Sequence, residues 1–232
     1  MTITRLLAST ATAALLFGAA TAQAADGPFT LSGTAAVTSD YVFRGVSQTD
    51  EKAALQAGLT VSHESGLWAG AWASNVDDDF IPGADVELDL SAGYSNSVGD
   101  FSYTAGVYWY TYPGQDDGAD VNYVELGFTG SYTLDKFAFT GQVYWSPEFT
   151  GPAGGDAYYG NIGASYALTD AFKIYYAAGK SWIQEGTNYV DWNIGAAFTY
   201  NAFTFDVKYT DTDLDDSDIA DSRIVGTVTF AF

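Results

Sequence analysis

Apolar and polar residues alternate along almost the whole chain from residue 29 to residue 232. Between Phe29 and Arg44, the odd positions are mainly apolar, and the even positions are mainly Thr, Ser, Asp and Arg. The same split returns downstream, for example in 85–94, 123–129 and 203–210. Because successive side chains of a strand point to opposite faces, this period of two predicts strands with one apolar and one polar face.

The alternating runs predict twelve strands, an even number as in single-chain bacterial barrels. The expected strands are 29–44, 52–64, 67–76, 85–97, 101–112, 121–133, 136–146, 157–168, 171–182, 189–200, 203–211 and 221–232. The connectors alternate between tight turns at 65–66, 98–100, 134–135, 169–170 and 201–202 and longer segments at 45–51, 77–84, 113–120, 147–156, 183–188 and 212–220. We therefore expect an all-β, transmembrane antiparallel up-and-down β-barrel, with short periplasmic turns, longer extracellular loops and both chain ends in the periplasm.

Composition favours a membrane barrel over a soluble protein. The chain is 47% hydrophobic, 16% aromatic and 16% charged, whereas a soluble domain usually carries about a quarter charged residues. The expected mature chain has no stretch near the roughly 20 apolar residues of a membrane helix. A net charge of −21 argues against nucleic-acid binding. A soluble antiparallel sandwich is the alternative, but its outward face should be polar.

The first residues are typical of an export signal. Arg5 supplies a positive charge, residues 6–20 form an apolar core, and Ala22-Gln23-Ala24 fits a cleavage site. We expect 1–24 to be a signal peptide and 25–232 to be a single barrel domain in the bacterial outer membrane. The absence of Cys is compatible with this compartment.

Aromatic residues gather near the expected strand ends, as in the girdles of membrane barrels. The inner girdle would contain Tyr94, Phe101, Tyr103, Tyr132, Phe137, Tyr166, Phe172, Tyr200 and Phe203. The outer girdle would contain Tyr41, Phe43, Trp109, Trp145, Tyr158, Trp192 and Tyr209. The last strand ends on Phe232, which resembles the signal that outer-membrane assembly machinery reads.

Charged residues on the polar face are expected in the lumen, because Arg or Lys facing lipid near mid-bilayer costs roughly 2–4 kcal/mol. The expected lumen-lining residues are Asp40, Arg44, Lys52, Glu87, Asp89, Glu125, Lys173, Asp191, Asp206, Lys208 and Arg223. They would line a water path or form salt bridges that fill a narrow interior. Six tyrosines share this face and would either guide a solute or fill space: Tyr108, Tyr110, Tyr123, Tyr144, Tyr159 and Tyr175.

Acidic residues concentrate in the longer loops. The expected acidic mouth comprises Asp77, Asp78, Asp79, Asp116, Asp117, Asp213, Asp215, Asp216 and Asp218. Such a ring would concentrate cations and repel anions. The last run lacks the Gly and Glu of an EF-hand loop, so no metal site is assigned, although loose divalent binding that bridges to lipopolysaccharide phosphates stays open.

The expected loops bound the pore. None exceeds about ten residues, so we expect no loop to fold far into the barrel as a constriction, and the few residues before the first strand leave no room for a plug domain. Eight-stranded barrels fill with side chains and 16-stranded barrels leave an aqueous channel. Twelve strands therefore predict a narrow pore for passive diffusion of ions or small solutes.

One motif carries a family resemblance. Ser39-Asp40-Tyr41-Val-Phe43-Arg44-Gly45-Val-Ser-Gln-Thr, together with 66–77 and 87–94, resembles the TorF-type porin family of proteobacterial outer membranes. The likeness covers essentially the whole mature chain. It implies a barrel fold, an outer-membrane location and a porin role, and it assigns no catalytic residue.

Two other functions remain as alternatives. A barrel enzyme is disfavoured, because the single histidine, His63, is expected at the periplasmic end, away from any outer-leaflet nucleophile. Glu87 and Asp89 have a spacing that allows acid/base work but more often reflects lumen polarity. A structural or adhesive barrel without conductance is the main competitor of the pore. No cofactor is expected.

Overall fold

Twelve long strands close into an antiparallel barrel in the computed structural model, which describes residues 27–78, 80–215 and 217–232. The expected signal peptide, Asp79 and Asp216 lie outside the described residues. The barrel strands are β1 (Phe29–Thr38), β4 (Ala54–His63), β5 (Leu67–Asn75), β6 (Val86–Val98), β7 (Phe101–Thr111), β8 (Tyr123–Leu134), β9 (Phe137–Ser146), β10 (Ala157–Ala167), β11 (Phe172–Ile183), β12 (Tyr189–Tyr200), β13 (Phe203–Thr212) and β14 (Arg223–Ala231). The fold class, the strand number and the turn positions are therefore confirmed.

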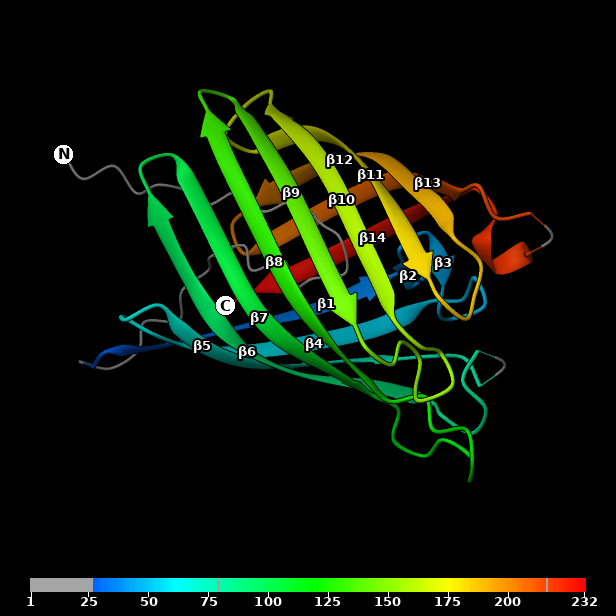
Figure 1. Ribbon diagram of the computed structural model, residues 1–232. Coiled ribbons are helices and arrows are strands. Elements are labelled where there is room, and N and C mark those ends of the chain that lie inside the picture. Colours follow the sequence, from blue (N-terminus) through cyan, green and yellow to red (C-terminus); the bar gives the residue numbers. More distant parts are fainter. Residues whose placement is uncertain (1–26, 79, 216) are drawn as a thin grey trace.

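Each strand pairs with its neighbours in the sequence, and β1 closes the sheet against β14. At this seam, Thr34–Thr38 of β1 lie opposite Thr227–Ala231 of β14. Phe232 extends the pairing, because its backbone exchanges hydrogen bonds of 2.9 and 3.0 Å with Gly33. The tight turns gather at one end of the barrel and the long loops at the other (Figure 1).

The outer wall is apolar, as the alternation predicted. Leu31, Val143 and Ile162, for example, expose 44%, 58% and 70% of their surface. Among the described residues, forty large hydrophobic side chains are exposed to 36% or more, and water would penalise so large an apolar surface. The same residues form a favourable contact with lipid, which explains why the sequence tolerates them on the outside of a barrel.

Several inward-facing glycines are covered by aromatic rings from the neighbouring strand. The direct cross-strand pairs are Gly58 with Trp72, Gly93 with Trp68, Gly127 with Tyr144, and Gly195 with Tyr175. A Cβ atom at each glycine would contact the paired ring, so the rings lie against the wall above backbone without side chains. Tyr144 and Tyr175 are buried in this arrangement, which favours space filling over an accessible slide for solutes.

The first strand differs from its prediction. It leaves the wall after Thr38 instead of continuing to Arg44, and residues 39–53 turn into the interior. We call residues 39–53 the inward segment. Within it, β2 (Val42–Phe43) and β3 (Val46–Ser47) form a small two-stranded sheet, here called the inner hairpin, at the loop end of the barrel (Figure 1). The expectation that no loop folds into the barrel is wrong.

A short 3-10 helix, Asp218–Ala220, lies in the loop before β14 and packs against β3. The other loop-end connections are 76–85, 112–122, 147–156 and 184–188. Aromatic contacts at the turn end include Phe101 stacked near Tyr103 and Phe137 near Tyr166, in agreement with the inner girdle. Tyr41 and Phe43, expected in the outer girdle, instead face the interior because they belong to the inward segment.

Candidate functional site

The inner hairpin is built by a two-residue turn at Arg44 and Gly45. Both residues have positive φ, 48° and 83°, as the tight hairpin turn with a matching strand twist requires. Gly45 also lies against Thr212 and Asp191, and a Cβ atom at this position would overlap with both side chains. The turn therefore needs Gly at its second position and holds the Arg44 side chain at the tip of the hairpin.

Asp40 organises the base of the inward segment. Its Oδ1 accepts a hydrogen bond of 2.6 Å from the Ser47 hydroxyl and lies 2.9 Å from the Thr49 hydroxyl. Its Oδ2 pairs with Arg223 Nη1 of β14 at 3.0 Å. The Thr49 hydroxyl in turn accepts the backbone N–H of Tyr41 at 3.0 Å. These contacts make Asp40 a buried anchor that ties the inner hairpin to the wall.

Arg44 reaches the opposite wall. Its Nη2 lies 2.9 and 2.8 Å from the two carboxylate oxygens of Glu125, and both side chains are almost fully buried. Glu125 belongs to β8, which lies across the barrel from β1 in the strand order. The Tyr110 hydroxyl donates a further bond of 3.1 Å to Glu125. This ion pair spans the interior, because it joins a segment that leaves β1 to the far side of the sheet.

Aromatic rings surround the Arg44 guanidinium. Its Cζ lies 4.2 Å from the centroid of the Tyr159 ring, 4.6 Å from Phe43 and 5.5 Å from Tyr144. Cation–π contacts of this kind contribute about 2 kcal/mol or more when they are desolvated. The guanidinium is therefore held by one carboxylate and several rings, and it has little freedom to move while the ion pair persists.

Two aromatic residues of the inward segment contact a third part of the wall. Tyr41 packs edge-on against Trp72 of β5 and donates a 3.3 Å hydrogen bond to Glu87 of β6. Phe43 packs against Tyr110 of β7. Tyr41 and Tyr110 belong to a buried cluster at the loop end. With the Arg44 contacts, the inward segment touches strands around most of the barrel and narrows the interior there.

The charged residues predicted on the polar face all lie inside the barrel except Lys52. Asp40, Arg44, Glu87, Glu125 and Asp191 are buried, while Asp89, Lys173, Asp206, Lys208 and Arg223 are partly buried. Asp40 and Arg44 occupy the inward segment and not the wall. On the β11–β13 side, the Tyr175 hydroxyl lies 2.8 and 2.9 Å from the two carboxylate oxygens of Asp206. The acids Glu87, Asp89 and Glu125 belong to β6 and β8, and Lys173 and Lys208 belong to β11 and β13.

Lys52 is an exposed residue of the mouth. Its Nζ lies 2.9 Å from Asp77 and 3.1 Å from Asp50, and its side chain is 64% exposed. The hydrogen bonds to Asp77 and then to Asp50 raise the pKa of Lys52 above its ordinary value, so the ammonium stays charged at neutral pH. The expectation that Lys52 lines the lumen is wrong, because β4 begins only at Ala54.

The acidic mouth is present in the loops at the end that holds the inner hairpin. Of the predicted mouth acids that the structure describes, Asp78, Asp116, Asp117, Asp213, Asp215 and Asp218 are exposed, and Asp77 is partly buried beside Lys52. Asp213 also accepts the backbone N–H of Val190 at 2.6 Å, so one of these carboxylates holds β12 and the last loop together. No group of three or more His, Cys, Asp and Glu residues in 27–78, 80–215 and 217–232 is arranged to hold a metal ion.

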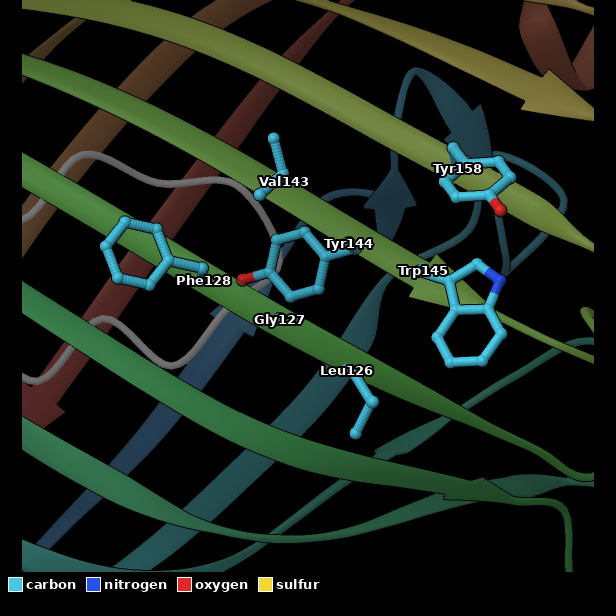
Figure 2. Close-up of a pocket in the computed structure, with 7 residues that line it drawn as sticks. All are labelled: Leu126, Gly127, Phe128, Val143, Tyr144, Trp145 and Tyr158. Atoms are coloured by element: carbon cyan, nitrogen blue, oxygen red, sulfur yellow. The ribbon is translucent and has the colours of Figure 1, made fainter.

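A shallow groove of about 310 Å³ lies on the outer wall and not in the lumen (Figure 2). Exposed Leu126, Phe128 and Val143 line it. Trp145 and Tyr158, which pair across β9 and β10, lie side by side at one end. The groove is part of the apolar surface and does not lie on a path through the barrel.

His63 ends β4 at the turn end of the barrel. Its Nδ1 accepts the Ser65 backbone N–H at 3.1 Å and lies 2.8 Å from the Ser65 hydroxyl; Ser65 is exposed and His63 partly exposed. This pair stabilises a tight turn.

No helix in residues 27–78, 80–215 and 217–232 is long and apolar enough to cross a membrane.

The sequence patterns missed the partners that hold the inner hairpin. Ser47 and Thr49 had no predicted role, and Tyr159 was expected only to guide a solute or fill space. Tyr41 and Phe43 were expected in the outer girdle. Two signals were available: a turn-forming Arg44-Gly45 pair at the end of the expected strand 29–44, and two charged residues, Asp40 and Arg44, among its last five residues. An earlier end of the first strand, before Asp40, would have placed the motif at the site.

The fold and the site define a closed twelve-stranded antiparallel barrel of porin-like architecture with a small hairpin folded inside. The chain belongs to the Gcw_chp family, described as a bacterial protein of unknown function, whose sequence profile matches residues 22–230. No curated protein matches the chain.

Solved porins share the fold at low sequence identity. A KdgM porin is 10% identical with a TM-score of 0.59, over 87% of this chain and 99% of that one. A structure of the KdgM porin in complex with disordered oligogalacturonate is 9% identical with a TM-score of 0.60, over 87% and 98%. The NanC porin is 9% identical with a TM-score of 0.56, over the same shares. These likenesses show the barrel fold.

Proposed function

We propose that this protein is an outer-membrane channel for passive diffusion of ions or small solutes, and that the inner hairpin forms its constriction. The observation that carries the proposal is the Arg44–Glu125 pair, which holds a hairpin across the inside of an otherwise polar barrel. A barrel that served only as a membrane anchor would not need a dedicated inward segment. The resemblance to TorF-type porins and the fold shared with KdgM and NanC support the same role.

The location and partners are part of the same proposal. An apolar outer wall, the expected signal peptide of residues 1–24 and the porin-like fold support insertion in the outer membrane. We assign lipopolysaccharide and outer-membrane lipid as neighbours of the outer wall, and the assembly machinery as a partner of the strand that ends at Phe232. Cation preference follows from the exposed carboxylates of the mouth, which raise the local cation concentration.

A non-conducting structural barrel is the second candidate, and one observation favours it. Arg44, Glu125, Tyr159 and Asp191 are all buried at the level of the inner hairpin. Dense packing at this level would stop hydrated solutes unless the hairpin moves. The two candidates therefore make opposite predictions about current through a folded barrel.

Single-channel recording of the purified, folded protein in planar bilayers separates them. We expect small, defined conductance steps, and a reversal potential in a KCl gradient that reports cation preference. A folded protein that gives no steps would exclude the channel and leave the structural barrel. Steps with anion preference would keep the channel and show that Lys173, Lys208 or Arg44 governs selectivity.

A further inference from the structure

Glu87 and Asp89 form a pair of inward carboxyl groups without a basic partner. They lie two residues apart on the inner face of β6, close enough for direct electrostatic repulsion. Glu87 is only 2% exposed. None of the ion pairs within 4 Å among the described residues includes Glu87 or Asp89. The basic partners in these pairs have other carboxylates: Arg44 pairs with Glu125, Arg223 with Asp40 and Glu51, and Lys52 with Asp50 and Asp77.

Their hydrogen bonding is also incomplete. Glu87 Oε1 accepts the Tyr41 hydroxyl at 3.3 Å, and the two carboxyl groups lie within hydrogen-bonding reach of each other. No N–H or O–H group of the described residues reaches the buried atoms Glu87 Oε2 and Asp89 Oδ1. A buried carboxylate without a partner is strongly disfavoured, and two that repel each other are worse. Either a shared proton or a bound cation must therefore compensate this pair, because no basic side chain of the described residues does so.

We propose that Glu87 and Asp89, with the Tyr41 hydroxyl beside them, bind a hard metal cation at the level of the inner hairpin. The donor set consists of oxygen atoms only, which suits Ca²⁺ and related cations, and two carboxylates balance one divalent charge. The remaining ligands of the ion would be water. Two protein carboxylates resemble the weaker calcium sites, with dissociation constants on the order of 10⁻⁴ to 10⁻³ M.

The proposal deepens the proposed function, because a cation held beside Tyr41 would lie against the constriction. Calcium binding does not require conductance. Folded protein in detergent can bind Ca²⁺ even if it conducts no ions in a bilayer, and a barrel that conducts ions can lack the calcium site. The two proposals are therefore tested by separate measurements.

Calorimetric titration of the folded full chain with CaCl₂ in detergent tests the site. We expect one saturable site that is lost in the double variant Glu87→Gln/Asp89→Asn. The matched control replaces the exposed mouth acids Asp213, Asp215 and Asp218 with Asn and should retain the site. A second control, Asp206→Asn, removes a lumen carboxylate that already has Tyr175 as a partner and should also retain it.

Heat-modifiable migration on gels and circular dichroism verify that each variant is folded. If the double variant misfolds, Asp89→Asn alone is titrated and should weaken binding at least tenfold. Equal Ca²⁺ binding by the wild type and by the variants at Glu87 and Asp89 would overturn the proposal. Loss of binding only in the variant of the mouth acids would also overturn it. Absence of any saturable binding to the wild type would show that the pair shares a proton and would equally overturn it.

Discussion

At the scale of single residues, Arg44 joins the inner hairpin to the opposite wall. It combines a positive φ, a buried pair with Glu125 and contacts with several rings. A buried ion pair repays its desolvation only when its geometry is good, and the loss of one partner leaves the other charge uncompensated. This pair therefore holds the tip of the hairpin firmly, and the removal of one partner should lower the free energy of unfolding of the protein.

Arg44→Met should destabilise the protein by about 3–5 kcal/mol, because Glu125 then stays buried without its countercharge. The double variant Arg44→Met/Glu125→Gln should recover a large part of this loss, since neither charge remains. Urea unfolding in lipid vesicles, followed by tryptophan fluorescence, measures both free energies. Additive losses in the double variant would show that the two side chains do not interact.

At the scale of elements, the inward segment is separable from the barrel wall. All twelve wall strands pair with wall neighbours, and the inner hairpin pairs only within itself. The inward segment is connected to the wall by side chains such as Asp40, Tyr41 and Arg44 and by a backbone hydrogen bond of 2.9 Å from Ser39 to Gly226 of β14. The barrel should therefore close without the inner hairpin, whereas the width of the interior depends on it.

Replacement of residues 42–47 by a flexible Gly/Ser linker of equal length should raise single-channel conductance severalfold, because the residues that cross the interior are removed. The barrel should still migrate as a folded, heat-modifiable species. The same replacement at residues 150–155, six residues without a charged side chain in the loop 147–156, serves as a matched control and should leave conductance near that of the wild type. Unchanged conductance in the hairpin variant would contradict the assignment of the constriction.

The seam between β1 and β14 makes a second element-level prediction. Deletion of Phe232 removes two backbone hydrogen bonds to Gly33 and a ring that stacks near Phe230. It also removes the expected assembly signal. We expect unfolded periplasmic protein, detected as loss of heat-modifiable migration, while Phe232→Tyr should assemble normally. Wild-type abundance of folded deletion variant would refute this role.

The alternation of residues was sufficient to predict the wall but not the inward segment. A strand in the wall shows one apolar and one polar face, and β4 to β14 follow this rule closely enough to be located within a few residues. In residues 39–48 the same alternation continues, because the inner hairpin is also extended chain. Inside the barrel, however, both of its faces are buried, so Tyr41 faces Glu87 where the pattern predicted lipid. The partners Glu125 and Arg223 are distant in sequence, and no local pattern reveals them.

At the scale of the whole molecule, charge is divided between a strongly acidic mouth and an interior that contains both signs. The net charge is −21, and exposed acids of several loops lie at the end that also holds the inner hairpin. Dissolved salt screens the interactions of exposed charges and shortens their range, whereas buried pairs such as Arg44–Glu125 are screened much less. Salt dependence can therefore separate the contribution of the mouth from that of the interior.

Cation preference should fade as salt rises, since the Debye length falls from about 30 Å at 0.01 M to about 3 Å at 1 M. Replacement of Asp213, Asp215, Asp216 and Asp218 with Asn should weaken the preference at low salt and leave it nearly unchanged at high salt. Stability should change little, because exposed charges contribute little to folding. Reversal potentials in KCl gradients measure the effect; a preference that is independent of salt and of these residues would exclude the mouth as its source.

The ion pair between Asp40 and Arg223 joins residues 183 positions apart and bridges the inward segment to β14. An incomplete sheet, with β1 and β14 still separate, cannot make this contact. The base of the inner hairpin is therefore fastened only after the circle of strands is complete. An assembly intermediate that stalls with an open seam would hold its hairpin through contacts such as Arg44–Glu125 but would lack the connection to β14. Closure of the barrel and completion of the attachment of the hairpin thus become a single event.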